Sequence, residues 1–206
     1  MKNRIILTAP SVMIAYAVLI VSVYRTTSAK LVYGQDSLTK YFLQLNTSPI
    51  DYLLPTELQY YPTDPRWTMN ALEDKISLMV SFDPLVKSVT MRAHADERLV
   101  AGVKLINDGD TAMGMAYLAK SQEYLHMSFM EVREINSLEA RSELQKISLA
   151  SLAHRVVLEQ LLSASDDAMK SQVMGIMDKA KLVYKESRVV IELFGDKAPR
   201  NIFDEN

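Results

Sequence analysis

Residues 5–24 form a run of 20 mostly apolar positions without a charged side chain. This run constrains the chain more than any other feature. A helix of that length rises about 30 Å, which matches the hydrocarbon thickness of a bilayer. Lys2 and Arg4 precede the run, and this charge bias favours a cytoplasmic N-terminus. The sequence therefore predicts a single-pass membrane anchor over residues 1–25, with the remainder on the extracytoplasmic side.

The anchor interpretation names the lipid-facing positions as Ile5, Val12, Ile20 and Tyr24, with the tyrosine at the membrane interface. An alternative is a cleaved signal peptide ending near residues 27–29, which read Thr-Ser-Ala. The apolar region of a cleavable peptide usually spans about 7–15 residues, and this run is longer. Both interpretations deliver the rest of the chain to the same side of the membrane.

The composition excludes several classes of function. There is no cysteine, so disulfides, thiolate zinc sites and cysteine nucleophiles are all absent. Outside the anchor, residues 26–206 carry 20 basic and 25 acidic side chains, a net charge of −5. Nucleic-acid binding requires a basic face that displaces counterions. We therefore expect no nucleic acid among the partners.

Residues 26–66 are rich in proline and tyrosine and are interpreted as an extended arm. A short helix is expected near residues 37–45. The apolar side chains of the arm are expected to lie against the helical body, and the alternative is a segment that binds a partner. The prolines are Pro49, Pro55, Pro62 and Pro65, and the tyrosines are Tyr33, Tyr41, Tyr52, Tyr60 and Tyr61.

Residues 67–195 show helical periodicity throughout, with no proline between Pro84 and Pro199 and no alternation typical of strands. The predicted fold class is all-α, an N-terminal transmembrane helix followed by an antiparallel bundle of four to five helices, with residues 196–206 as a tail. The expected inward-facing residues are Met69, Leu72, Ile76, Met79 and Val80; Val89, Ala93, Val100, Val103 and Ile106; Met113, Tyr117, Tyr124, Met127 and either Met130 or Val132; Leu144, Ile147, Leu152, Val156, Leu158 and Leu161; and Val173, Met177, Ala180, Tyr184, Ser187, Ile191 and Phe194.

Helix boundaries follow from capping residues. Asp83 and Pro84 are predicted as an N-cap and the first helical position, in a helix that runs to about residue 106. Residues 107–110 and 163–167 read as turns, the second with Ser165 or Asp166 as cap, and Gly195 ends the last helix. Residues 136–137 are either a break or a surface point on one long helix, and the sequence leaves this open.

Residues 38–194 contain several short motifs in a fixed order. They are Leu54-Pro55, Glu73, Phe82-Asp83-Pro84, Ala95-Asp96-Glu97-Arg98-Leu99, Gly109-Asp110, Tyr124, and His154 followed by Val157-Leu158-Glu159. Together these motifs resemble an uncharacterised family of extracytoplasmic helical domains of bacteria and archaea. Arg188 departs from the pattern, because a glycine often follows the serine at 187. The family has no known activity, so the resemblance implies location and fold only.

Candidate chemistry is sparse. Glu123 and His126 have the spacing that places a carboxylate and an imidazole on one helix face, as in bundle metal sites. A di-iron site needs a second such pair, which the sequence lacks, so we expect no metal and no cofactor. Residues 96–98 and 131–134 are interpreted as solvated, ion-paired faces. An alternative is a buried Arg98 that bridges helices through Glu73 and sets their register.

The twelve methionines are expected mainly in the core, the alternatives being an adaptable binding groove or a Cu(I) site. No nucleophile elbow, P-loop or glycine-rich dinucleotide turn is present. The sequence thus predicts a non-catalytic scaffold or accessory subunit of a cell-envelope complex, with protein partners in the envelope. The alternative is an extracytoplasmic ligand or metal sensor that signals through a partner protein.

Overall fold

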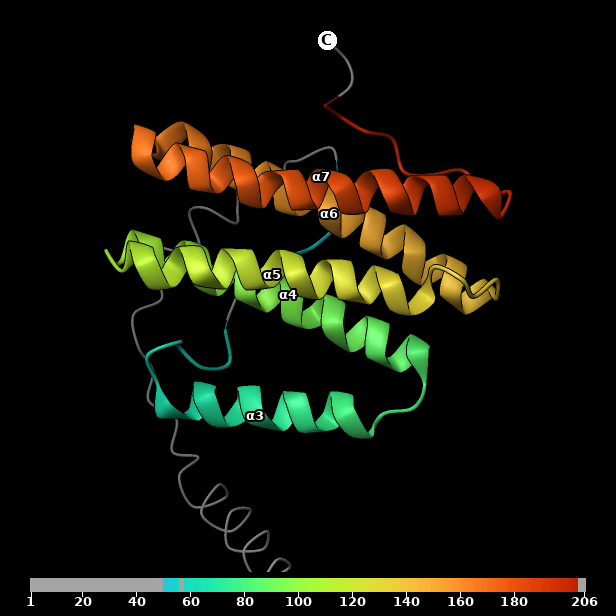
Figure 1. Cartoon of the computed structure of the whole chain (residues 1–206), viewed down its shortest axis with the longest axis horizontal. Coiled ribbons are helices and arrows are strands. Elements are labelled where there is room, and N and C mark those ends of the chain that lie inside the picture. Colours follow the sequence, from blue (N-terminus) through green and yellow to red (C-terminus); the bar gives the residue numbers. More distant parts are fainter. Residues whose placement is uncertain (1–49, 56–57, 204–206) are drawn as a thin grey trace, which may run out of the picture. The chain divides into compact units, whose positions relative to one another are not determined.

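The computed structural model describes residues 50–55 and 58–203, and this part of the chain is entirely helical (Figure 1). It contains no strand, which confirms the all-α class for the described residues. None of the described helices has the combined length and apolar character needed to cross a bilayer. The predicted anchor, with Ile5, Val12, Ile20 and Tyr24, lies outside the described residues. The helices are α3 (Pro65–Val80), α4 (Pro84–Asn107), α5 (Thr111–Val132), α6 (Leu138–Ala164) and α7 (Asp167–Leu193).

Each helix begins at a side chain that accepts a hydrogen bond from a backbone N–H of the first turn. The predicted step at Asp83 and Pro84 is confirmed, because the Asp83 carboxylate accepts from Leu85 N. The open question at residues 136–137 is settled as a break, since Ser137 caps α6. The five N-caps are Asp64, Asp83, Asp110, Ser137 and Asp166.

Two glycines follow helix ends with positive φ, Gly109 at 95° and Gly195 at 83°. Only glycine adopts this left-handed conformation without a steric penalty. Gly109 turns the chain from α4 into the cap of α5 within three residues, so these two helices form a close hairpin.

Small residues at seven-residue intervals let α4 and α5 approach closely. The Ser88 and Ser128 hydroxyl groups lie 3.0 Å apart, and each also donates to the backbone carbonyl of the other residue at 2.9 Å. Because a heptad step keeps residues on one face, the pattern holds the two helices together along their length. The facing pairs are Ser88 with Ser128, Ala95 with Ser121, and Gly102 with Gly114.

The glycine pair marks a very tight contact in this hairpin. A Cβ placed on Gly102 would lie 2.9 Å from Gly114 O and 2.8 Å from the Leu118 side chain. Ser121 adds a hydrogen bond from its hydroxyl to Ala95 O at 2.8 Å. The hairpin is therefore closed by backbone proximity and hydroxyl groups as well as by apolar packing.

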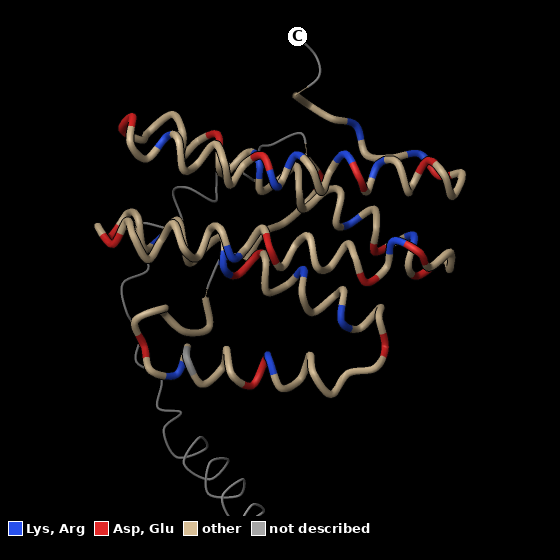
Figure 2. The backbone as a smooth tube through the Cα atoms, viewed as in Figure 1, with Lys and Arg blue, Asp and Glu red and all other residues tan. Residues whose placement is uncertain are grey.

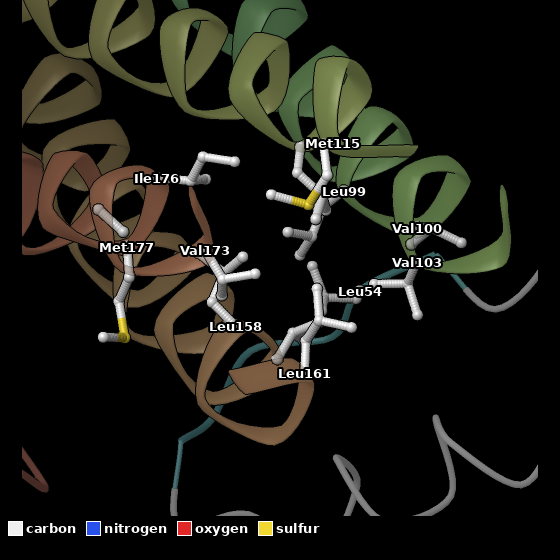
Figure 3. Close-up of a cluster of buried hydrophobic side chains, with 13 residues drawn as sticks. Leu54, Leu99, Val100, Val103, Met115, Leu158, Leu161, Val173, Ile176 and Met177 are labelled. Carbon is white, nitrogen blue, oxygen red and sulfur yellow. The ribbon is translucent and has the colours of Figure 1, made fainter. Parts of the chain in front are cut away.

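The α6–α7 hairpin packs against the α4–α5 hairpin, and the core lies between them (Figure 1). The arm contributes to this core, because Leu54 is buried among side chains of α4 and α6 such as Val103 and Leu161 (Figure 3). Ile50 is also buried, against Leu152 of α6. The expectation that apolar arm residues lie against the bundle is confirmed for these two positions.

In α7, six of the seven predicted inward-facing positions are buried, from Val173 to Ile191, and Phe194 is partly exposed. In α6, five of the six predicted positions are buried and Val156 is partly exposed.

The predicted inner face of α3 is wrong, because Met69, Leu72, Ile76, Met79 and Val80 are all exposed. The side of α3 that packs against the bundle carries Trp67, Asn70, Ala71, Asp74 and Leu78, all partly buried. Hydrophobicity alone pointed to the other side of this helix. The physical reason is that the contact side mixes the apolar Trp67 and Leu78 with polar residues such as Asp74, so it is less uniformly apolar than the exposed side.

The predicted inner faces of α4 and α5 are correct only in part. In α4, Val100 and Val103 are buried, whereas Val89 and Ala93 are exposed and Ile106 is partly buried. In α5, Tyr124 and Val132 are buried, and Met113, Met127 and Met130 are exposed. The prediction that most methionines lie in the core is therefore also wrong for the described residues. The buried stripes of both helices contain polar side chains, which interrupt the apolar pattern.

Candidate interaction surface and buried polar network

The exposed apolar residues of α3 follow one another at three- and four-residue steps. Met69, Leu72, Ile76 and Met79 are between 41% and 80% exposed and occupy the spacing of a two-heptad seam. We call these four residues the α3 apolar face. Phe82, in the connection to α4, is 92% exposed. Large apolar side chains that share one helix face and contact water are typical of a surface that binds a protein.

Contacts on the opposite side hold α3 to the bundle. The ring of Trp67 packs on that of Tyr117 in α5, with centroids 5.8 Å apart. Leu78 packs against a buried cluster with members from α4, α5, α6 and α7. Figure 2 shows that charged positions on α3 are confined to its start and its middle. Because Trp67 and Leu78 make these contacts on one side of α3, the α3 apolar face lies on the side turned away from the bundle.

Asp74 and His94 form the polar contact between α3 and α4. His94 Nδ1 lies 3.5 Å from Asp74 Oδ2 and 3.9 Å from the Glu97 carboxylate. The His94 ring is buried, and neither of its nitrogens has a hydrogen-bond partner among the described residues. Burial raises the pKa of the Asp74 carboxyl, and the nearby His94 and Arg98 oppose this rise.

A second feature is a polar network inside the bundle, contributed by the arm and three helices. The Tyr52 hydroxyl donates to Asp96 Oδ2 at 2.6 Å, and His154 Nε2 lies 2.8 Å from Asp96 Oδ1. On the other edge of the ring, His154 Nδ1 lies 3.1 Å from Gln122 Nε2. An amide N–H can only donate, so Nδ1 accepts and Nε2–H donates to Asp96. The arrangement fits a neutral imidazole.

Arg92 extends this network to Glu143 of α6. Its Nε donates to Glu143 Oε1 at 2.6 Å, and its Nη1 donates to the Tyr52 hydroxyl at 2.9 Å. Burial alone would lower the pKa of the Arg92 guanidinium, but the hydrogen bonds to Glu143 and Tyr52 raise it overall. We call the whole set the buried polar network; its members are Tyr52, Arg92, Asp96, Gln122, Glu143 and His154.

Burial defines what the network can do. His154 is fully buried, and Asp96 and Glu143 are only 6% and 2% exposed. Burial and the neighbouring Asp96 charge raise the pKa of the Tyr52 phenol, so the hydroxyl keeps its proton. Each charged group accepts or donates hydrogen bonds within the network. These bonds stabilise one register of the arm and helices and do not offer a reactive group to solvent.

The chain matches no protein family, no curated protein and no solved structure. The resemblance to extracytoplasmic helical domains therefore stays a prediction. The α3 apolar face and the buried polar network are interpreted below from their own geometry and chemistry.

The predicted bridge between Arg98 and Glu73 does not form. Arg98 is buried, but its guanidinium donates to His94 O at 3.3 Å and lies 4.4 Å above the Tyr124 ring. Glu73 is exposed on α3. The solvated face expected at residues 96–98 is also wrong, because Asp96 and Arg98 are buried and only Glu97 is substantially exposed.

Glu123 and His126 each lie beside a side chain of the opposite charge type. Glu123 accepts a hydrogen bond from Lys120 at 2.7 Å, which lowers the pKa of its carboxyl, and His126 lies 3.7 Å from Glu186 of α7. No group of three or more His, Asp or Glu side chains suited to a metal occurs in the described part of the chain. These two residues belong to exposed ion pairs.

Sequence reasoning missed the buried polar network, although one signal pointed to it. Stepping back by four from Val100 leads to Asp96 and then Arg92, so both lie on the buried stripe of α4. Following apolar residues alone leads instead from Val100 to Ala93 and Val89, which are exposed. Gln122 and Glu143 carried no comparable signal, because their burial depends on which helices face each other.

Proposed function

We propose that the chain is a membrane-anchored extracytoplasmic scaffold or accessory subunit of a cell-envelope complex and acts without catalysis. The observation that carries the proposal is the α3 apolar face, which leaves Leu72, Ile76 and Met79 in water. Burying apolar surface contributes about 25 cal/mol per Å², so covering this face would drive association. The uncharged run at residues 5–24 supports the anchor.

The partner that fits the α3 apolar face is an amphipathic helix of another protein. Residues at 69, 72, 76 and 79 repeat with the spacing by which two helices interlock along a seam. Glu73 and Lys75 flank this seam with opposite charges, and both are exposed. A helix with complementary flanking charges and a matching apolar stripe would cover the face.

The test is purification of the full-length protein from its native membrane in a mild detergent, followed by identification of stoichiometric partners. Leu72→Glu and Ile76→Glu should release the partner without lowering the melting temperature, because both side chains are exposed in the isolated chain. Leu182→Glu, at an exposed apolar position on α7, is the matched control and should keep the partner.

Two outcomes would reject the proposal. One is a strictly monomeric particle with no stoichiometric partner. The other is a partner that stays bound to both α3 variants, which would place the interface elsewhere. A tag at the C-terminus tests topology separately, and a tag protected from external protease in intact cells would reject the extracytoplasmic location.

The alternative function is ligand sensing through a partner protein. It is favoured by a cavity between α6 and α7 that is described below. Calorimetric titration with divalent metals tests metal sensing, and the absence of a binding signal with every metal would reject it.

A further inference from the structure

A cavity of about 280 Å³ lies between α6 and α7, beside the C-terminal segment. Its floor is made by buried residues, among them Leu152 of α6 and Ala180 and Tyr184 of α7. This volume is just below the usual range of small-molecule sites, about 300–1,000 Å³. We call this cavity the α6–α7 groove.

Four cations line the rim of the α6–α7 groove. Lys181, Lys185 and Arg188 follow at steps of four and three along α7, which places them on one face, and Arg155 comes from α6. Among the described residues, no aspartate or glutamate lines the groove. A site with a partly apolar floor and a rim of one charge sign is suited to an anion.

Acidic side chains outside the groove pair with three of these four cations in the described part of the chain. Arg155 pairs with Glu159 at 2.9 Å, Lys181 with Asp178 at 3.0 Å and Arg188 with Glu192 at 2.8 Å. The pairs of Lys181 and Arg188 are exposed and lie within one helix, so they are weak and their cations can turn toward a ligand. Lys185 forms no ion pair with any described residue. Figure 2 shows basic positions with acidic ones among them along α7.

The C-terminal segment fixes one wall of the groove. The Tyr184 hydroxyl donates to Pro199 O at 2.8 Å, and Asn201 lines the cavity. The guanidinium of Arg155 lies 3.7 Å above the ring of Phe203. This stacking orients a planar group with several donors before any ligand arrives.

We propose that the α6–α7 groove binds a small ligand that carries a phosphate group. Phosphate oxygens accept several hydrogen bonds at once, and an arginine with neighbouring lysines is suited to hold them. The apolar part of the ligand would lie on Leu152 and Ala180. The proposal goes beyond the scaffold function and is independent of the α3 apolar face. Two sources share this chemistry, namely a free phosphate compound and the headgroup of an anionic lipid.

The experiment is calorimetric titration of the full-length protein in a non-ionic detergent. The two probes are inorganic phosphate and dihexanoyl phosphatidylglycerol, and they distinguish the two sources. Lys185→Glu reverses the charge at the rim and should weaken binding by about tenfold or more. Lys179→Glu makes the same change at an exposed position of α7 outside the groove and is the matched control.

Binding of either probe that is weakened by Lys185→Glu and unchanged by Lys179→Glu supports the proposal. Preference for inorganic phosphate indicates a soluble ligand, and preference for the lipid indicates a headgroup. The proposal is overturned if neither probe binds, if Lys185→Glu leaves binding unchanged, or if both variants weaken it equally. Both substitutions are at exposed positions, so unchanged melting temperatures verify that the variants are folded.

Discussion

His154 Nε2 lies 2.8 Å from Asp96 Oδ1, although the two residues are 58 positions apart in the sequence. The contact joins α6 to α4 inside the bundle, where both side chains are buried. The same carboxylate accepts the Tyr52 hydroxyl, so the arm is attached at the same point. One aspartate therefore links three segments that are distant in sequence.

We expect Asp96→Ala to cost about 1–3 kcal/mol of unfolding free energy for each of the two buried donors, on His154 and Tyr52, that it leaves without an acceptor. Chemical denaturation of the variant and the wild type measures this loss. The double variant Asp96→Ala, His154→Leu should be less destabilised than the sum of the two single variants. Strict additivity would show that the two side chains do not interact.

Alkaline pH should destabilise the fold through Tyr52. Because burial raises the pKa of this phenol, the folded state favours the protonated form. The stability it contributes is complete below about pH 10, the ordinary pKa of tyrosine, and is lost as pH rises above that value. Tyr52→Phe should cost about 1–3 kcal/mol at neutral pH. The variant should then lose less stability than the wild type between neutral and strongly alkaline pH, and parallel losses would contradict the assignment.

Arg92→Met should be strongly destabilising, at about 3–5 kcal/mol, because the buried Glu143 carboxylate loses its counter-charge. Lys120→Met is the matched control, since it breaks an exposed pair with Glu123 and should cost less than about 1 kcal/mol. Thermal unfolding of both variants tests the contrast. Similar melting temperatures for the two would show that the buried pair contributes no more than a surface pair.

Gly102→Ala should destabilise the α4–α5 hairpin by about 1–3 kcal/mol, because the new Cβ would meet Gly114 O and Leu118 below van der Waals distance. Gly175→Ala provides the comparison. That glycine lies inside α7 with nothing within 4 Å of an added Cβ, so alanine should stabilise the helix by about 1 kcal/mol. Calorimetry should show opposite shifts of the melting temperature, and shifts of the same sign would contradict the close approach.

Val173→Asp should unfold the domain, since it places an unpaired charge in the apolar seam of α7. Met174→Asp, one residue further and 51% exposed, should leave the melting temperature within a few degrees of the wild type. Circular dichroism measures both. If Val173→Asp melted normally, the assigned inner face of α7 would be wrong.

The inner face of α7 was well predicted for a physical reason. In α7 the buried stripe from Val173 to Ile191 is made mostly of apolar and small residues, so periodicity alone identifies it. In α4 and α5 the buried stripes include Ser88, Asp96 and Gln122, which hydropathy counts as surface residues. The prediction therefore placed the inner faces of these two helices partly on their exposed sides.

Local chemistry along the chain determined the helical class, the cap at Asp83 and the glycine stops, because each depends on neighbours within a few residues. Only the tertiary structure decided that Asp96, His154 and Tyr52 satisfy one another, and that the apolar stripe of α3 is left in water. A polar side chain is stable inside the bundle only when a partner from another helix reaches it. An apolar face is buried only when another surface covers it. Both conditions depend on how distant segments pack, which local sequence does not specify.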